Sequence, residues 1–537
     1  MHAGAGIDNT RRGGSVMARL ADIANRHPRL LALALGVVSA TGFEPLHFWP
    51  LALLAMGGFA VLLTRAGTWR QALWWGWLFG WAHFTFGNNW IATAFTHQAA
   101  MPAVLGWVAV PLLAVYLAVY PALAAAGAWA VARGRVAIMA PALGGCWIVT
   151  EWLRSWVFTG YAWNPFAMVL LGPFDRPGLA ALAPWMGTYA LSGLAVVLAA
   201  GFAMLLQRRR WVAAGAAAAL VAAGMYLPTG VGREGTLDYT LVQPDLRQYR
   251  INEPIYYEAN FRRLAQLSRA PSGQDGPRLV LWPESSIADF LEDGYPQRYY
   301  EGTTFLSSPV LARDRLARLI GADGMLLTGN TGLKIEGGRA VGAYNYVLAV
   351  DGAGQIRGRF AKSHLVPYGE YLPMRGILEP LGLSRLVPGA MDFLPGSGPD
   401  TMHLGQFGRI GVQICYEIVF SGQIVDRADR PDFIFNDSND GWFGAFGPPQ
   451  HLAQARMRAV EEGLPVLRST TTGISAVIDA RGVVRSYIPS NTMGRIDGKV
   501  PPAAPPTLFA RLGNVLPLLW AIAILATALI ASRRRAR

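Results

Sequence analysis

The chain has 537 residues, of which 52% are hydrophobic and only 15% are charged, and its mean hydropathy is +0.28. This composition is too apolar for an ordinary water-soluble protein and predicts a membrane protein. The formal net charge of +13 does not indicate a nucleic-acid partner, because the arginines cluster at the ends of apolar runs, as they do in the cytoplasmic loops of membrane proteins.

The first part of the chain predicts a membrane domain. Residues 1–29 are basic and are expected to form a cytoplasmic tail, and residues 30–235 hold seven apolar runs. Most of these runs approach or exceed the ~20 residues that cross a bilayer, although the first two are short. An eighth run lies within residues 501–537, after a proline-rich linker. The eight predicted spans are 30–45, 50–64, 72–95, 102–132, 136–157, 178–206, 211–228 and 513–531.

The loop charges predict the orientation of this bundle. Arginine-bearing turns alternate onto one side, whereas the opposite loops at 44–50 and 96–102 hold no Lys or Arg. By the positive-inside rule both termini are cytoplasmic, and residues 236–500 lie on the outer, periplasmic face. In an alternative, the first run is a cleaved signal peptide with a cleavage site near 38–40. That alternative leaves the large domain on the same side.

Two features at the end of the fifth run carry polar or aromatic side chains. Glu151 and Arg154 are three residues apart and can pair on one helix face. The loop at 160–166 is aromatic and falls on the periplasmic side. It fits an interfacial aromatic belt, or a surface that faces a lipid headgroup or acyl chain. The second interpretation makes Trp163 a candidate substrate-binding residue.

Residues 236–500 have a different pattern. Short β-type runs are interleaved with helical patterns, which predicts an α/β domain. Strands are expected at 237–242, 279–282, 325–329, 343–350, 409–414, 432–436, 466–470 and 475–479, and helices at 255–269, 312–320 and 451–462.

A strand predicted within this domain ends on Cys415. The other cysteine of the chain, Cys146, falls in an apolar run, so a disulfide between the two is not expected. Folds with a sheet core present nucleophiles at strand ends, which makes Cys415 a candidate nucleophile. A buried structural cysteine is the alternative that the strand by itself leaves open.

Cysteine chemistry also needs a base and a cation. A thiol with an ordinary pKa near ~8.5 is mostly protonated at neutral pH, so a base must accept its proton. Glu284 emerges just beyond a predicted strand and fits that role. Lys362 could stabilise an oxyanion together with the backbone N–H of Tyr416, and Glu370 could orient the lysine. A simple buried ion pair of Lys362 with Glu370 is the alternative, and spacing alone does not join these groups to Cys415.

Three segments carry a resemblance to a known family: Trp-Pro-Glu-Ser at 282–285, Lys-Ser-His-Leu-Val-Pro-Tyr-Gly-Glu-Tyr at 362–371, and Ile-Cys-Tyr-Glu at 414–417. Together they resemble the carbon–nitrogen hydrolase (nitrilase) superfamily, with its Glu-Lys-Cys triad. Seven spans before such a domain and one after it look like the apolipoprotein N-acyltransferase family. The resemblance implies an α-helical transmembrane bundle of eight spans joined to an α/β, nitrilase-like αββα sandwich.

Residue by residue, the resemblance implies Glu284 as general base, Lys362 as stabiliser of the oxyanion and Cys415 as nucleophile. It implies supporting roles for three neighbours: Glu370, Tyr416 and Glu417. The family's Asn-Asp-x-Trp-Phe motif appears within 436–443 and adds Trp442 and Phe443 as candidate substrate-binding residues. Relatives often carry other residues where this chain has Ile251-Asn252 and Thr471-Thr472, which puts details of substrate binding in doubt.

The activity implied by the resemblance is a two-step acyl transfer through a cysteine thioester. The expected donor is a membrane phospholipid, phosphatidylethanolamine above all, and the expected acceptor is the α-amino group of a diacylglyceryl-modified apolipoprotein. No cofactor, no metal and no nucleic acid is expected, and the enzyme is expected to be a monomer in the bacterial inner membrane. The main alternative is a membrane-tethered amidase or nitrilase acting on a small amide. Further rivals are a non-catalytic binding protein and a cysteine protease that uses His364, His403 or His451.

Overall fold

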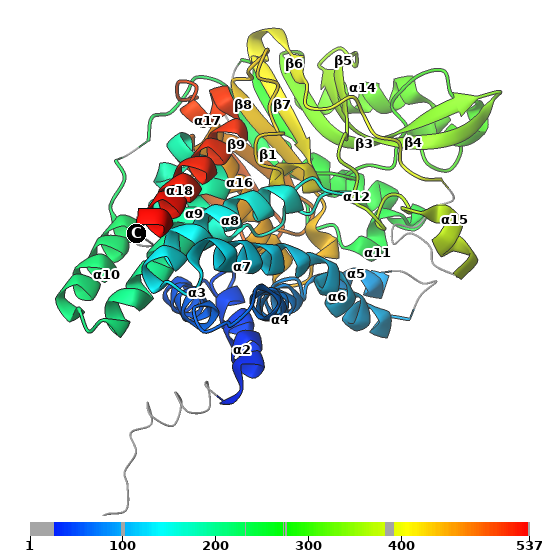
Figure 1. Ribbon diagram of the computed structural model, residues 1–537. Helices are drawn as coiled ribbons and strands as arrows, with labels where there is room; N and C mark the ends of the chain where they lie inside the picture. Colours follow the sequence, from blue (N-terminus) through cyan, green and yellow to red (C-terminus); the bar gives the residue numbers. More distant parts are fainter. Residues whose placement is uncertain are drawn as a thin grey trace, which may run out of the picture.

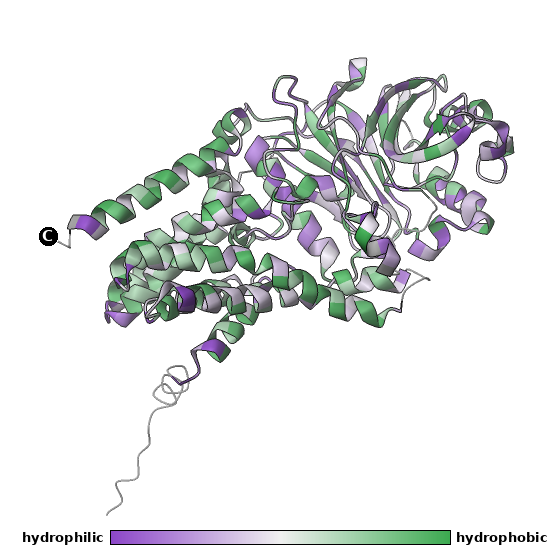
Figure 2. Ribbon diagram, turned by 45° about the vertical axis from the view of Figure 1, so that its right-hand side comes forward, coloured by the Kyte–Doolittle hydropathy of each residue, from purple (hydrophilic) through white to green (hydrophobic). Residues whose placement is uncertain are grey.

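The computed structural model describes residues 26–97, 102–230, 232–271, 273, 276–381 and 391–534, so most of the predicted basic tail lies outside the described residues. A bundle of helices lies against a domain built on two β-sheets (Figure 1). Coloured by hydropathy, the helices of the bundle are mostly apolar, whereas the domain is mixed (Figure 2). The predicted fold class, an apolar helical bundle joined to an α/β domain, is therefore confirmed.

Each predicted apolar run coincides with a helix or with a pair of consecutive helices. Among the described residues, four helical stretches are long and apolar enough to cross a membrane, and α2, α3 and α10 are apolar but shorter. The count of eight spans stays a prediction. The bundle comprises α2 (Pro28–Ala40), α3 (Trp49–Leu63), α4 (Trp69–Gly87), α5 (Ile91–Ala94), α6 (Val104–Leu117), α7 (Val119–Ala132), α8 (Val136–Arg154), α9 (Ala183–Gln207), α10 (Trp211–Tyr226) and α18 (Val515–Arg534).

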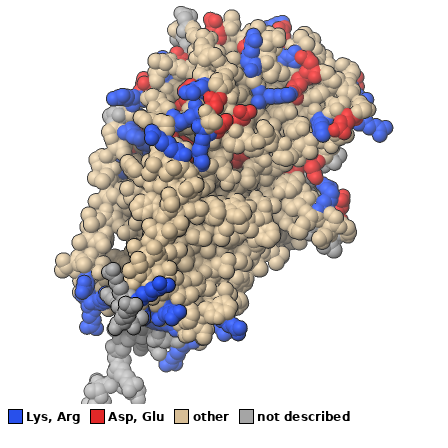
Figure 3. All heavy atoms as spheres, turned by 45° about the horizontal axis from the view of Figure 1, so that its top comes forward, with Lys and Arg blue, Asp and Glu red and all other residues tan. Residues whose placement is uncertain are grey.

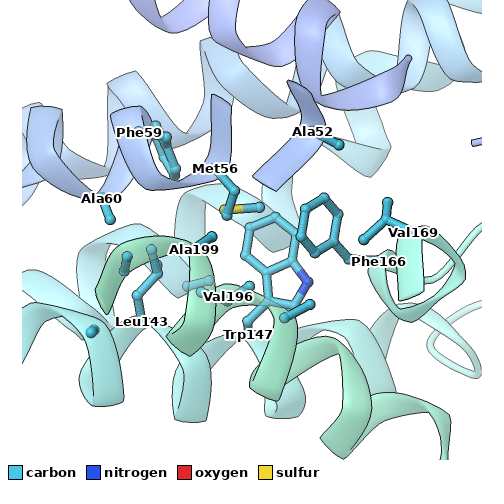
Figure 4. Close-up of a cluster of buried hydrophobic side chains, with 14 of the residues drawn as sticks. Ala52, Met56, Phe59, Ala60, Leu143, Trp147, Phe166, Val169, Val196 and Ala199 are labelled. Atoms are coloured by element: carbon cyan, nitrogen blue, oxygen red, sulfur yellow. The ribbon is translucent and has the colours of Figure 1, made fainter. Parts of the chain in front are cut away.

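Small and aromatic side chains alternate in the bundle core. Trp147 of α8 packs against Phe166 with ring centroids 5.9 Å apart, among side chains of α3 and α9 (Figure 4). At Gly57 of α3, an added Cβ would lie 2.5 Å from the carbonyl oxygen of Ala199 on α9. Such close approach needs glycine or alanine, and it supplies the van der Waals contact that holds apolar helices together in lipid.

Several arginine-bearing turns lie at one end of the bundle. Trp129 Nε1 donates to the carbonyl of Ala66 at 2.7 Å, and the Arg135 guanidinium donates to the carbonyl of Ser532 near the end of α18. Figure 3 shows a broad band of surface without charged residues between this basic end and the charged surface of the domain. This band is the surface that faces the lipid chains if the bundle spans a membrane.

The domain is a sandwich of two six-stranded sheets, with strand orders β12-β1-β2-β3-β4-β5 and β11-β10-β9-β8-β7-β6. In each sheet three parallel strands lie at the centre, β1-β2-β3 and β9-β8-β7, with antiparallel strands outside them. The strands are β1 (Asp238–Gln243), β2 (Arg278–Leu281), β3 (Gly324–Glu336), β4 (Arg339–Asp351), β5 (Ile356–Ala361), β6 (Thr401–His403), β7 (Arg409–Ile414), β8 (Phe433–Ser438), β9 (Val466–Thr470), β10 (Ser475–Ile478), β11 (Val484–Ile488) and β12 (Gly494–Lys499).

Successive side chains of a strand point to opposite faces of its sheet, which explains why the domain is built in layers. Leu279 and Leu281 of β2 point to the core between the sheets, whereas Val280 points to the outer layer formed by α12 (Pro254–Leu267) and α14 (Pro309–Ile320). On the second sheet the outer layer is α16 (Gly447–Glu462). The αββα sandwich is therefore confirmed.

Helix α16 lies between the second sheet and the bundle, and it is buried along its whole length. Arg456 donates to the carbonyls of Gly172 and Pro173, in the loop that leads to α9, at 2.9 and 2.7 Å. Glu461 accepts a hydrogen bond from the backbone N–H of Thr188 at 2.6 Å, next to the kink of α9 at Gly187. Polar contacts from α16 thus fix the domain on the bundle.

Candidate active site

The three triad residues predicted from the sequence follow three different strands. Glu284 comes three residues after β2, Lys362 directly after β5 and Cys415 directly after β7. Strands β2 and β5 run in the same direction within the first sheet, so their carboxyl ends lie at one edge. The facing sheet brings the end of β7 to the same place, and both Glu284 and Lys362 lie close enough to the Cys415 thiol to shift its pKa.

Cys415 stands at a sharp turn between β7 and a short 3-10 helix, η7 (Cys415–Val419). Its φ is +51°, a left-handed conformation that residues with a Cβ rarely adopt and that is typical of functional turns. His451 Nε2 lies 3.0 Å from the carbonyl oxygen of Cys415, which helps to hold this conformation. His451 therefore contacts the backbone of Cys415.

Glu284 is fixed by donors from both sheets. Its Oε1 accepts from Asn345 Nδ2 at 2.7 Å, and its Oε2 accepts from the backbone N–H of Asn439 at 2.7 Å. Lys362 Nζ lies 3.9 Å from the same Oε1. The carboxylate is thus held with little rotational freedom beside the thiol, as a general base must be.

Lys362 is almost completely buried and forms an ion pair with Glu370, with Nζ 3.0 Å from Oε1. The other oxygen of Glu370 accepts from the backbone N–H of Val366 at 2.8 Å. Burial by itself would lower the pKa of Lys362, but the carboxylates of Glu370 and Glu284 outweigh it and raise that pKa above its ordinary value. The lysine is therefore a permanent cation in the site.

The Cys415 thiol has a raised pKa. Burial is the main cause and the charge of Glu284 adds to it, whereas Lys362 acts in the opposite direction. The resting thiol is therefore protonated at neutral pH and needs a base to become a nucleophile. Glu284 is the carboxylate placed to accept that proton.

Glu417 joins the two halves of the site. Its Oε2 accepts from the backbone N–H of Ile414 at 2.8 Å, and its Oε1 accepts from Ser363 N and Oγ, both at 2.7 Å, and from His364 N at 3.0 Å. It thereby ties the end of β7 to the segment that carries Lys362. Burial raises the pKa of Glu417, while these hydrogen bonds oppose the rise.

Aromatic side chains from the bundle and the domain pack together around Tyr416, the residue that follows Cys415. Trp163 is fully buried and stacks on Tyr416 with ring centroids 6.4 Å apart. Phe443 lies 5.6 Å from Trp163 and 4.8 Å from Trp90, which follows α4. Trp442 is half-buried and packs at the edge of the same cluster, where it lies edge-on to His97 of the bundle. Of the three predicted substrate-binding residues, the structure thus places Trp163 and Phe443 in the buried cluster that also holds Cys415, with Trp442 at its edge.

A buried pair at the end of α8 holds the Trp163 loop. Arg154 Nη1 donates to the carbonyl of Trp163 at 2.9 Å, and Glu151 Oε1 accepts from the backbone N–H of Phe166 at 2.8 Å. The two charged groups lie 3.9 Å apart, so the predicted pairing within one helix is confirmed. This pair connects the bundle to the site.

Sequence reasoning missed several residues of the site. Asn345 lies within a predicted strand, and its polar side chain among apolar neighbours was the available signal. Asp440 accepts hydrogen bonds from Arg468 and contacts His451, and all three are fully buried.

Asp437 is also fully buried, and neither of its oxygens has a hydrogen-bond partner within the described chain. Burial, followed by the charge of Glu284, raises the pKa of Asp437.

Two further observations concern the cysteines and possible metal ligands. Both cysteines are free thiols. The described residues contain no group of three or more His, Cys, Asp or Glu side chains that could hold a metal ion.

Comparison with known proteins gives consistent matches along the chain. The description "Apolipoprotein N-acyltransferase N-terminal domain" matches residues 35–202, and "Carbon-nitrogen hydrolase" matches residues 246–504. A protein of Allorhizobium ampelinum named apolipoprotein N-acyltransferase is 34% identical over 512 residues, which cover 89% of this chain and 90% of the relative. Proteins of the same name from Rhodopseudomonas palustris and Vibrio cholerae are 32% and 30% identical, and the matches cover 94% and 93% of this chain and 96% of each relative. A solved CN-hydrolase superfamily protein of Xanthomonas campestris has 19% identity and a TM-score of 0.33, over 49% of this chain and 90% of that one.

Proposed function

The chain belongs to the apolipoprotein N-acyltransferase family, and from that premise we propose that it transfers a fatty acyl chain from a phospholipid to the N-terminus of a lipoprotein. One observation carries the residue assignment. The thiol of Cys415 is buried beside Glu284 and Lys362, beneath aromatic side chains that come partly from the bundle. A thiol covered by the membrane-facing part of the protein fits substrates that arrive from a lipid phase.

The first half-reaction forms a thioester. Glu284 accepts the proton of Cys415, and the sulfur attacks the carbonyl carbon of the lipid ester. The ammonium group of Lys362 and the backbone N–H of Tyr416 stabilise the oxyanion of the tetrahedral intermediate. The carbon–oxygen bond of the ester then breaks, Glu284 returns the proton to the leaving oxygen, and a lysophospholipid departs.

The second half-reaction forms an amide. The α-amino group of a diacylglyceryl-cysteine attacks the thioester, and Glu284 accepts a proton from that nitrogen. The carbon–sulfur bond breaks and Cys415 regains a proton, so the enzyme returns to its resting state. The aromatic cover of Trp163 and Phe443 supports this step, because a thioester must exclude water until the amine arrives.

Supporting roles follow from the contacts of each residue. Glu370 orients Lys362, and Glu417 fixes the turn of the nucleophile against the lysine segment. Tyr416 and Trp163 line the acyl position, with Phe443 beside them. Trp442 is proposed as an outer contact of the substrate.

The finer assignments belong to the same proposal. The enzyme acts in the bacterial inner membrane as a monomer, with eight spans, cytoplasmic termini and a periplasmic domain at 236–500. Phosphatidylethanolamine is the donor. The basic turns gathered at the end of the bundle away from the domain support this orientation.

The test replaces the nucleophile and uses the second cysteine as a matched control. Cys415→Ala should abolish conversion of diacyl to triacyl lipoprotein, whereas Cys146→Ala, in α8, should retain it. Mass spectrometry of the enzyme incubated with phospholipid alone should find a fatty acyl adduct on Cys415. Undiminished conversion by Cys415→Ala would falsify the mechanism, and turnover of small amides without any acyl adduct would favour the membrane-tethered amidase.

A further inference from the structure

A hollow lies apart from the candidate active site, where the domain meets the last helix of the bundle. Its volume is about 370 Å³, and none of its lining residues belongs to the site described above. The lining comes from the loop after η7, the end of α16, the proline-rich linker and α17 (Leu508–Leu512): Val425, Arg427, Arg430, Glu462, Pro506, Ala510 and Arg511.

The hollow is strongly cationic. Three of its seven lining residues are arginines, and one is a carboxylic acid. Arg430 donates through Nη2 to the backbone carbonyls of Glu462 and Gly463 at 2.9 and 3.2 Å, and Arg427 donates to the carbonyl of Gly422 at 3.0 Å. These acceptors are neutral, and within the described residues no carboxylate forms an ion pair with either arginine, although the charge of Glu462 acts on both.

Arg430 adds an unused donor. Its Nε is buried and has no hydrogen-bond partner within the described residues. Because this atom is buried, it does not face the hollow, and an anionic oxygen would reach it only after the guanidinium turned. A buried donor without a partner is costly, so such a turn would gain a hydrogen bond.

The position of the hollow relates it to the membrane. Arg511 lies four residues before the start of α18, the last apolar helix. The guanidinium of Arg427 packs on Gly513, where an added Cβ would lie 1.6 Å from Nη2. The hollow therefore opens at the end of the last span that is nearest the domain, which is the depth of lipid headgroups if α18 crosses the bilayer.

Apolar surface continues from the hollow along the same helices. Leu508 and Leu512 of α17 and Val515 and Leu519 of α18 are exposed. A molecule with an anionic head and apolar chains would contact the arginines and this surface together. Arginine is the side chain best suited to phosphate, because its planar fork donates two parallel hydrogen bonds.

We propose that this hollow binds the phosphate group of a membrane phospholipid, at a site separate from that of acyl transfer. Such a lipid would hold the domain at a fixed height on the bilayer and would not be consumed. Glu462 would lie near the bound phosphate and would weaken its binding by repulsion.

Lipid retention by the full-length protein tests the proposal. Native mass spectrometry in detergent would count the phosphatidylglycerol molecules bound at each lipid concentration. The combined change Arg427→Gln, Arg430→Gln and Arg511→Gln should weaken the tightest binding by roughly 100-fold, because each arginine near an anionic lipid contributes roughly fivefold. The matched control changes three exposed arginines of the far side of the domain: Arg262→Gln, Arg318→Gln and Arg357→Gln.

Two further variants keep the test independent of misfolding. Arg511→Gln removes an exposed side chain and should weaken lipid binding by roughly fivefold with an unchanged unfolding temperature. Glu462→Gln should strengthen binding, an opposite sign that mere damage to the fold would not give. The proposal is overturned if the arginine variants retain the lipid, if the control loses as much, or if inorganic phosphate displaces the lipid at a similar concentration, since a free phosphate would then be the ligand.

Discussion

The helical bundle and the α/β domain bury charged groups in different ways. The bundle core in Figure 4 is hydrocarbon and aromatic, and Glu151 and Arg154 form a buried pair at the end of α8 that faces the domain. The domain instead buries ionisable groups at its strand ends and along α16: Glu284, Lys362, Glu370, Glu417, Asp437, Asp440, Arg456, Arg458, Glu461 and Arg468.

The difference indicates that the domain and the bundle contribute to one site in different ways. Charged groups at the strand ends, above all Glu284 and Lys362, act on the thiol and set its ionisation, whereas the pair in the bundle holds the loop of Trp163, which packs on Tyr416 next to the thiol. A buried charge is expensive in either environment, so each is expected where it performs a function. Changes in the domain should therefore alter the chemistry, and changes in the bundle should alter the cover.

The largest effect is expected from Lys362→Met. Loss of the fixed cation should reduce acyl transfer by roughly 10²–10³-fold, as for other groups that stabilise an oxyanion. Because Lys362 opposes the rise in the Cys415 pKa, its loss should raise that pKa further. The rate of Cys415 alkylation, measured against pH in a Cys146→Ala background, should then rise only at higher pH.

The matched control for this change is Lys334→Met, an exposed lysine that pairs with Glu336 on the first sheet. It should leave both the transfer rate and the alkylation profile unchanged. An alkylation profile of Lys362→Met that coincides with that of the parent would show that the cation does not act on the thiol.

The sequence predicted most of the fold, for a physical reason. Spans and buried parallel strands are continuous apolar runs, so the helices of the bundle and the strands β7 and β9 were predicted with almost their observed bounds. The strands that were missed, β5, β6, β11 and β12, lie at or next to the outer edges of the sheets. They are partly exposed and mixed in polarity, so their pattern is close to that of loops.

The sequence predicted the main residues of the candidate site but not the residues that hold them in place. Glu284, Lys362 and Cys415 were recognised from short motifs at strand ends. Asn345 and Asn439 could not be recognised in this way, because their contacts to Glu284 join segments far apart in the sequence. The position of α16 between two layers was missed for the same reason: Arg456 is buried and donates to the carbonyl of Gly172, which lies far away in the sequence.

A smaller effect is expected in the bundle, from Arg154→Met. Trp163 would lose a hydrogen bond from a charged donor, worth about 1.5–3 kcal/mol, so its loop should be held less firmly over the thiol. We expect a fall in acyl transfer of roughly tenfold, with an unchanged pH profile of Cys415 alkylation. A shift of that profile would mean that Arg154 acts on the thiol itself.

A double variant separates the two consequences of this change. Arg154→Met leaves Glu151 buried without its partner, whereas Arg154→Met combined with Glu151→Gln removes both charges. The double variant should unfold at a higher temperature than the single variant while its transfer rate stays low. If the double variant regained the parental rate, the loop contact to Trp163 would not be the cause of the loss.

The smallest effect is expected from Asp437→Asn, and it should be an increase in stability. The pKa of Asp437 is raised by burial and by Glu284, and its oxygens lack partners within the described chain. In the unfolded chain this carboxyl loses its proton above about pH 4, whereas the folded protein retains it, so the free energy of unfolding falls as the pH rises from there towards the raised folded pKa. Asparagine has almost the same size as aspartate and cannot ionise, so the free energy of unfolding of the variant does not fall in this way.

Unfolding temperatures measured in detergent test whether Asp437→Asn stabilises the protein. Asp437→Asn should unfold at a temperature higher than the parent by about 2–4 °C per kcal/mol at pH 7.5, and the difference should disappear near pH 4. Asp323→Asn, a change at an exposed position, should show no such dependence. An equal rise in unfolding temperature at both pH values would mean that the asparagine improves packing. A lower unfolding temperature at pH 7.5 would mean that the Asp437 carboxylate is ionised and stabilises the fold. The buried charges of the domain would then contribute to its stability as well as to its chemistry.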